Sequence, residues 1–341
     1  MDTGLLLASR LGVPPFSGGV VDELAGPLIH AAPQPGSPPS AAWIQEAVGA
    51  AARHQRSDHV ERAWPLLRVL EPLAPALLDR DPASAGRVIG ALATQALVEG
   101  DVEAFLDRAG RAAEAFDRAG AAGAAAFERA TLGAGYRVLG VWDEAEGALR
   151  AALGAATPEV EAWVRLDLAT VTAARGGGDE ARGLAGEAAV AFARRGNGAG
   201  EGVARVRLAG ILAAQGEGAA AEAEARRAGD LLAGSAAGRA LAGAALARGL
   251  LAQGKIEAAL AAAEDAHREM AAVRLPDEGE VGLLVALADA RRAAGNAAGA
   301  AAALGEARRR VLADASRLRN PVFRQAFLGV PEHRRALEVP A

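Results

Sequence analysis

The stretch FERATLGAGYRVLGVWDEAEGALRAALGAATP, at residues 127–158, is the most informative part of the chain. In it, Leu132 precedes Gly140 by eight positions. That distance is little more than two helical turns, and it ends at the residue best suited to stop a helix. Beyond the glycine, Ala145 and Leu149 continue an apolar series with helical spacing. The stretch therefore predicts a hairpin of two helices with small and large apolar residues on facing stripes.

The same spacing occurs six times along the chain. In each copy a leucine followed by a small residue stands eight positions before a glycine, at Leu92 and Gly100, Leu132 and Gly140, Leu168 and Gly176, Leu208 and Gly216, Leu246 and Gly254, and Leu287 and Gly295. Successive copies lie 36 to 41 residues apart, in the range typical of helical repeat arrays. Five residues after the glycine, most copies carry an alanine that lets two helices approach closely: Ala145, Ala181, Ala221, Ala259 and Ala300. One hairpin cannot bury both of its stripes, so neighbouring hairpins are expected to stack.

These residues resemble the tetratricopeptide repeat family, in which Leu, Gly, Tyr, Gly, Ala and a closing Pro fall at the same offsets. The copy at 127–158 is the best match, and the resemblance covers roughly residues 86–315. The chain looks like a divergent, long-period member, because its period exceeds the family's usual 34 or so residues. The family's early Trp is replaced by Ile89, Arg129, Arg165, Arg205, Gly243 and Leu284. The resemblance implies an all-α fold, a right-handed superhelix (α-solenoid) of about six helix hairpins with capping helices at both ends.

The sequence divides into four parts on this interpretation. Residues 1–40 are rich in Pro and Gly and are expected to form an arm or linker, with a short helix near residues 20–30. Residues 41–85 are expected to form an N-terminal helical cap, or alternatively part of a truncated neighbouring domain. Asp81 and Pro82 suit the N-cap and first position of the next helix. The repeat array occupies residues 86–318, and residues 319–341 are expected to be C-terminal capping helices.

The C-terminal segment carries signals of its own. Asn320 and Pro321 predict a helix start, Phe323 and Phe327 share one face of that helix, and Pro331 predicts the start of another. The expected role is to cover the open edge of the last repeat. The segment also resembles the closing part of tetratricopeptide regions in large bacterial signalling kinases, cyclases and ATPases. That resemblance implies a sensor or scaffold arm and transfers no catalytic residue.

Composition excludes several classes of function. The net charge is −5 with no basic stripe, so nucleic-acid binding is not expected. The chain has no cysteine, so disulfides and thiolate metal sites are excluded. It shows neither a signal peptide nor an apolar run of membrane-spanning length, which predicts a cytoplasmic protein with no membrane partner. Its richness in Ala, Gly and Arg is typical of a GC-rich bacterial genome.

No motif in the chain predicts chemistry, so we expect no enzyme, cofactor or metal site. The stretch GLLAQGKI at residues 249–256 approaches a phosphate-binding loop, but Ile256 stands where Ser or Thr is required. His54 and His59 are five residues apart, off the spacing for one metal ion, and are expected to be solvated. The glycine cluster at residues 196–202 lacks the pattern of a dinucleotide loop and predicts a flexible connector.

Function is therefore expected to be binding on the inner face of the superhelix, which the first helix of each hairpin lines. Aligning the copies puts eight residues on that face: Arg87, Thr94, Arg137, Trp163, Thr170, Arg248, Asp289 and Arg292. The arginines suit the carboxylates of an acidic partner protein or peptide, although ordinary solvated side chains would give the same pattern. The leading hypothesis is an interaction scaffold in bacterial signalling or regulation. The alternatives are a sensor region of a signalling ATPase, kinase or cyclase that responds to a small ligand, and self-association through an uncapped end.

Overall fold

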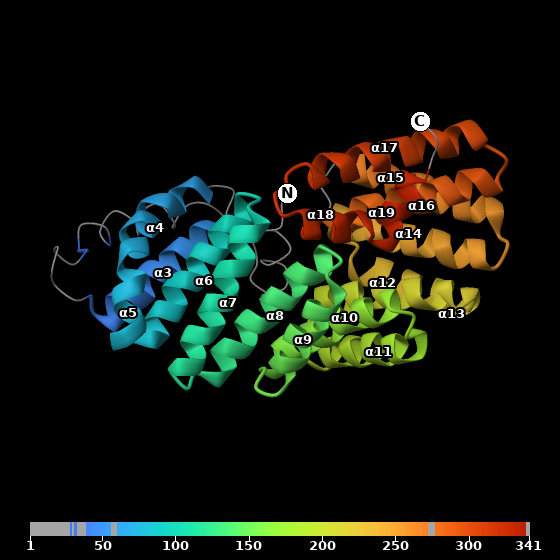
Figure 1. The fold of residues 1–341 in the computed structure, drawn as a ribbon. Helices are drawn as coiled ribbons and strands as arrows, with labels where there is room; N and C mark the ends of the chain where they lie inside the picture. Colours follow the sequence, from blue (N-terminus) through green and yellow to red (C-terminus); the bar gives the residue numbers. More distant parts are fainter. Residues whose placement is uncertain (1–27, 29–30, 33–38, 56–59, 272–276, 339–341) are drawn as a thin grey trace. The chain divides into compact units, whose positions relative to one another are not determined.

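The computed structural model describes residues 28, 31–32, 39–55, 60–271 and 277–338. Every regular element in those ranges is a helix, and none is a strand (Figure 1). The predicted all-α fold is therefore confirmed. Almost all of the Pro/Gly-rich arm, including the helix predicted near residues 20–30, lies outside the described residues. Among the described helices, none is both long and apolar enough to cross a membrane.

Six consecutive hairpins form the repeat array, as the leucine–glycine spacing predicts. We call the first helix of each hairpin the A helix and the second the B helix. The pairs are α6 (Pro82–Val98) with α7 (Val102–Arg118), α8 (Ala122–Val138) with α9 (Trp142–Leu153), α10 (Pro158–Ala174) with α11 (Gly178–Arg194), α12 (Gly198–Ala214) with α13 (Gly218–Leu231), α14 (Ala236–Ala252) with α15 (Ile256–Ala271), and α16 (Asp277–Ala293) with α17 (Ala297–Ala315).

The glycine of each copy makes the turn between the A and B helices. All six of these glycines have positive φ, between 73° and 88°, a region that residues with a Cβ rarely adopt. At Gly254, for example, the amide donates to the carbonyl oxygen of Leu251, and the next amide donates to that of Leu250, so the turn satisfies the last carbonyls of α14. Two glycines between hairpins, Gly120 and Gly196, also have positive φ. The glycine that recurs eight positions after each leucine therefore marks the end of each A helix.

The chain divides into two compact units. The first comprises residues up to 135 together with 151–157, and the second comprises residues 136–150 and 158 onward. The boundary thus passes through α8 and α9. In the described part of the first unit, five elements precede the array: α3 (Ala41–Gln55), η1 (Val60–Ala63), α4 (Trp64–Leu70), η2 (Glu71–Leu73) and α5 (Ala74–Arg80).

The core of the first unit joins these five elements to α6. Ile44, Leu66 and Leu70 are fully buried in one cluster with the N-terminal half of α6. Gln55 at the end of α3 donates to the carbonyl oxygen of Ala91, at 2.9 Å. The start of α6 is as predicted, because the Asp81 side chain accepts a hydrogen bond from the Ser84 amide and Pro82 is the first helical residue. Residues 41–55 and 60–80 are therefore packed onto the first hairpin.

In the second unit, the A helices of successive hairpins pack directly on one another. Contacts run from α10 to α12, α12 to α14 and α14 to α16, whereas the B helices α11, α13, α15 and α17 make no comparable contacts with each other. The alanines that follow the turn glycines are at most 2% exposed, as expected for close helix pairing. The hairpins consequently lie closest together along the A helices and separate along the B helices.

The glycine cluster at residues 196–202 is not the flexible connector that the sequence predicts. Gly196 forms the turn, and Asn197 caps α12 by accepting from the Gly200 amide at 2.8 Å. Gly200 and Gly202 lie in the first turns of α12, where a Cβ would stand 2.6 Å from Phe192 and Leu232, respectively. These glycines therefore serve close packing between helices.

Candidate partner-binding face

Four residues at equivalent places in consecutive A helices define one face of the second unit. Each stands two positions after the leucine of its copy, and we call them together the A face: Thr170, Gly210, Arg248 and Asp289. All four are partly exposed. A Cβ placed on Gly210 would meet no atom of another residue within 4 Å, so this position opens to space. The A face changes in chemistry from one hairpin to the next, from neutral at α10 and α12 to charged at α14 and α16.

The charged residues of the A face are engaged by the end of the same chain. Two short helices, α18 (Pro321–Leu328) and α19 (Pro331–Leu337), follow the last hairpin. Arg335 of α19 forms a bidentate ion pair with Asp289, with N–O distances of 3.0 and 2.6 Å. Arg248 donates to the carbonyl oxygen of Gly282 at 2.8 Å and lies 3.9 Å from a carboxylate oxygen of Glu332. The predicted starts of both helices, at Pro321 and Pro331, are confirmed.

Arg137 does not lie on an open face, and the prediction that it does is wrong. Its side chain is 1% exposed, and its Nε lies 2.9 Å from an oxygen of Asp167, which is 5% exposed. Asp167 comes from α10, the next A helix, so this buried ion pair joins two consecutive hairpins. A partner has no access to the Arg137 guanidinium while the pair is intact.

The other predicted residues of the second unit are partly exposed. Trp163 packs its indole edge-to-face on Phe192 of α11, with ring centroids 4.6 Å apart. Thr170 donates to the carbonyl oxygen of Leu166 one turn earlier, at 3.3 Å. Arg292 is 59% exposed and lies 3.9 Å from Asp289. Trp163 is therefore mainly a packing residue, while Thr170 and Arg292 remain available at the surface.

Two predicted residues, Arg87 and Thr94, belong to the first unit. Both are partly exposed on α6. Arg87 is close enough to Asp81 to help lower the pKa of that carboxyl, after the larger effect of hydrogen bonding from Ser84. Thr94 donates to the Gly90 carbonyl oxygen at 3.1 Å. Because they belong to a different compact unit, we do not include them in the A face.

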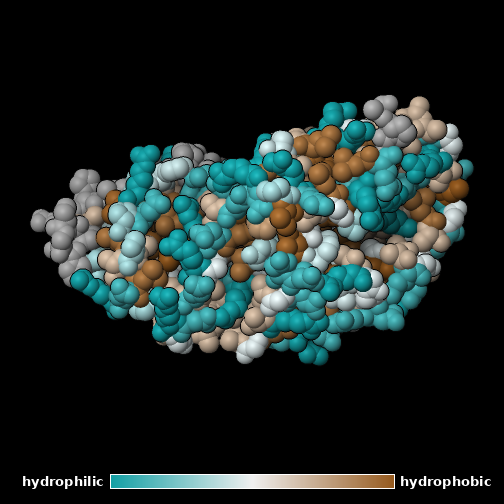
Figure 2. Space-filling model, in the orientation of Figure 1, coloured by the Kyte–Doolittle hydropathy of each residue, from teal (hydrophilic) through white to brown (hydrophobic). Residues whose placement is uncertain are grey.

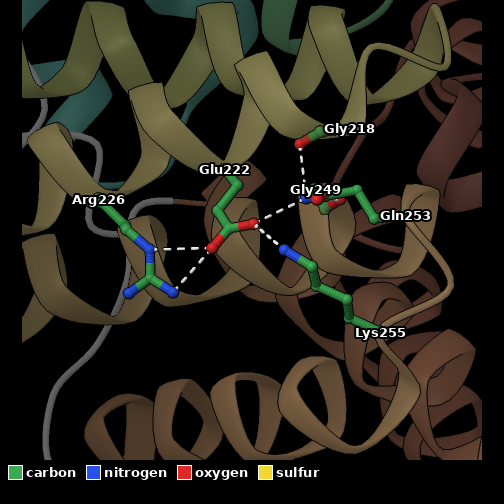
Figure 3. A network of polar contacts seen from close by, with 6 residues as sticks. All are labelled: Gly218, Glu222, Arg226, Gly249, Gln253 and Lys255. Carbon is green, nitrogen blue, oxygen red and sulfur yellow. Dashed lines mark hydrogen bonds and ion pairs between the residues drawn. The ribbon is translucent and has the colours of Figure 1, made fainter.

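The stretch resembling a phosphate loop is used for packing instead (Figure 3). Lys255 pairs with Glu222 of the preceding hairpin at 2.9 Å, and Gln253 donates to the same carboxylate at 2.8 Å. Arg226 binds the other oxygen of that carboxylate, at 2.8 Å. Hydrogen bonds from Lys255, Gln253 and Arg226 hold the pKa of Glu222 at about 2. Gly249 lies against the backbone of α13, so a Cβ there would be 2.9 Å from the Glu222 nitrogen.

A buried acid that the sequence analysis does not single out lies in the first unit. Glu128 of α8 is 9% exposed, and burial raises its pKa from 4.5 to about 8. Its carboxyl faces Gly90 of α6, where a Cβ would stand 2.6 Å from the acid oxygen. The glycine thus leaves room for a carboxyl that is neutral at ordinary pH. His54, expected to be solvated, is also buried at 1% exposure, whereas His59 lies outside the described residues.

A cavity of about 620 Å³ opens on the opposite side of the hairpins, between α11 and α13. It is lined by Leu208 and Leu212 of α12 and by small and charged residues of the two B helices. Its volume falls in the range of about 300–1,000 Å³ typical of small-molecule sites. Four of its charged residues already form ion pairs: Arg182 with Glu217, Glu187 with Arg165, and Glu224 with both Arg205 and Arg227.

Comparison with known proteins identifies the fold. No protein-family model and no curated protein sequence matches the chain. Among solved structures, the chain is similar to a Rap protein complexed with Competence and Sporulation Factor, with a TM-score of 0.55 and 11% identity over 87% of this chain and 86% of that chain. It is also similar to the APC/C hetero-tetramer Cut9-Hcn1, with a TM-score of 0.51 and 14% identity over 86% of this chain and 53% of that one. This chain therefore spans about half the length of that second structure.

These similarities define the class of protein. At such identities they concern the fold alone, and the fold is an all-α solenoid of tetratricopeptide-like helix hairpins. The predicted fold class is thereby confirmed.

Proposed function

We propose that the protein is a non-catalytic interaction scaffold that binds a partner protein or helical peptide on the A face, in a bacterial signalling or regulatory setting. The observation that carries the proposal is that this face already accepts a helix, because α19 lies on its charged half through Asp289 and Arg248. Stacked hairpins commonly present an extended binding surface of this kind. The similarity to Rap and Cut9 supports the same reading, since both were crystallised as complexes.

Two glycines provide a matched test. Gly210 lies on the A face and Gly183 lies on the B helix α11, and in each case a Cβ would meet no atom of another residue within 4 Å. Gly210→Arg and Gly183→Arg therefore add the same bulky charge to opposite sides without a clash of the Cβ. We expect affinity capture from the native host, quantified by mass spectrometry, to recover a partner with wild type and Gly183→Arg. Gly210→Arg should lose it. If Gly210→Arg captures the same partners as wild type, the A face is not the partner-binding surface.

A second candidate function is a ligand-responsive sensor region of a signalling ATPase, kinase or cyclase, which the cavity between α11 and α13 favours. Gly186 lines this cavity and has open space at its Cβ position, so Gly186→Leu would fill part of it. If a small ligand binds there, it should raise the melting temperature of wild type but not of Gly186→Leu. Equal shifts in the two proteins would place the ligand elsewhere.

A further inference from the structure

The C-terminal helices reach from the last hairpin back to the last residues of α8, which begin the second unit at Tyr136. Phe323 of α18 meets the ring of Tyr136 at the end of α8 edge-on, with centroids 6.3 Å apart. At the turn after α8, a Cβ on Gly140 would stand 2.8 Å from both the Ala326 carbonyl oxygen and the Val330 side chain. The segment is therefore seated closely on this turn. It crosses the unit rather than covering only the edge of the last repeat (Figure 1).

The charges on the A face and on α19 are complementary. Arg248 and Asp289 occupy equivalent places in consecutive A helices, one basic and one acidic. Glu332 and Arg335 are three residues apart, so they lie on one side of α19. Glu332 of α19 lies 3.9 Å from Arg248, and Arg335 forms an ion pair with Asp289 at 2.6 Å. A helix with an acidic residue and an arginine one turn later thus fits this pair in one orientation.

The segment is held by fewer buried side chains than the array helices. Only Phe327, His333 and Ala336 of α18 and α19 are buried, whereas α14 alone buries eight residues. His333 donates from Nδ1 to the Phe327 carbonyl oxygen at 2.7 Å, so part of this packing lies within the segment itself. Val322 remains 65% exposed, and apolar side chains gather at the surface over α17 and α18 in Figure 2. Elements with little buried surface are the first to open in local fluctuations.

We propose that the A face around Arg248 and Asp289 recognises a short helix bearing an acidic residue and an arginine three positions later. The resident ligand is α19 of the same chain, and a partner binds by displacing α18 and α19. This inference rests on the proposed scaffold function and gives it a partner chemistry and a means of control. In the free protein α19 occupies the site. A partner helix with the same pair of charged residues binds there when it displaces α18 and α19.

The test uses the full chain and a fluorescent peptide with the sequence of residues 319–338. Arg335→Glu reverses the charge that pairs with Asp289, and Arg334→Glu makes the same change next to it. Arg334 is exposed and forms no ion pair with another described residue. In Arg335→Glu we expect amide exchange in residues 319–338 to rise at least about tenfold, as for a locally opened element, with α10–α13 unchanged. The peptide should bind that variant at least about tenfold more tightly than wild type or Arg334→Glu, because the site is vacant.

A charge exchange separates recognition from loss of folding. Adding Asp289→Arg to Arg335→Glu restores opposite charges with their positions exchanged. This double variant should regain slow exchange in residues 319–338 and lose binding of the wild-type peptide. The inference is overturned if Arg335→Glu and Arg334→Glu behave alike in both measurements. It is also overturned if the peptide binds the double variant as well as it binds Arg335→Glu.

The two proposals fail in distinguishable ways. If the peptide enters the vacated site but no cellular partner depends on the A face, the resident-ligand inference stands and the scaffold function is refuted. If a partner depends on Gly210 but the peptide never binds, the scaffold stands and the displacement mechanism is refuted.

Discussion

The buried carboxyl of Glu128 should make the first unit less stable as pH rises, whereas an acid whose pKa is lowered by folding makes a protein more stable. Its pKa is raised from 4.5 to about 8 in the folded protein because the carboxyl is removed from water. Between these two values the folded state binds more protons than the unfolded state, so the free energy of unfolding falls as pH rises. The contribution of the protonated Glu128 carboxyl to the free energy of unfolding is fully present below pH 4.5 and is lost by about pH 8.

The size of the effect follows from the same two values. At 1.36 kcal/mol per pKa unit, a rise from 4.5 to about 8 corresponds to at most about 5 kcal/mol. Glu128→Gln keeps the shape of the side chain and removes the titration. Near pH 5 the variant should match wild type to within about 1 kcal/mol, and near pH 8 it should be more stable by about 3–5 kcal/mol.

Urea denaturation followed by circular dichroism, repeated from about pH 5 to about pH 8, measures this difference. Repeat arrays often unfold in more than one step, so amide exchange in α6 provides a local reading of the same quantity. Glu114→Gln is the control, because Glu114 is an exposed acid on α7 of the same unit. The reasoning is refuted if Glu128→Gln and wild type have parallel pH profiles, or if wild type becomes more stable toward pH 8.

Three further perturbations have expected outcomes in urea denaturation. Gly200→Ala places a methyl group against a buried ring and should cost about 1–3 kcal/mol, whereas Gly183→Ala on α11, where a Cβ has open space, should gain up to about 1 kcal/mol. Arg137→Met leaves the Asp167 carboxylate buried without its ion-pair partner and should cost about 3–5 kcal/mol. Adding Asp167→Leu should recover most of that loss, and a double variant no more stable than Arg137→Met would contradict the buried-pair account. Lys255→Ala removes an exposed pair and should change stability by less than about 1 kcal/mol, and a larger loss would mean that the contact supports the turn.

The sequence was sufficient to predict the elements of the array and their pairing. The leucine–glycine spacing reports helix length and termination, both of which are local properties, so Gly100 and its equivalents predict the turns correctly. Similarly, Asp81 and Asn320 act through amides two or three residues away, and both cap as expected.

The site was harder to predict because its geometry depends on residues distant in sequence. Arg137 occupies a repeat position that would be exposed in a regular array, but Asp167, 30 positions later, buries it in an ion pair. The contact of Arg335 with Asp289 spans 46 residues, and no local pattern indicates that the chain returns to α16. Glu128 looks like an ordinary helix-surface acid until the gap left by Gly90 is known.

The packing of α18 on the turn at Gly140 adds a long-range contact to a repeat array whose other contacts join neighbouring hairpins. In an open solenoid each hairpin touches only its neighbours, contact order is low, and unfolding begins by fraying at the ends. Here residues near position 140 and near position 330 lie in contact, which closes a loop of nearly 200 residues. Forming that contact requires the intervening hairpins to be in place, so it should form late in folding. Its release would return the unit to nearest-neighbour cooperativity, with end hairpins that fray independently.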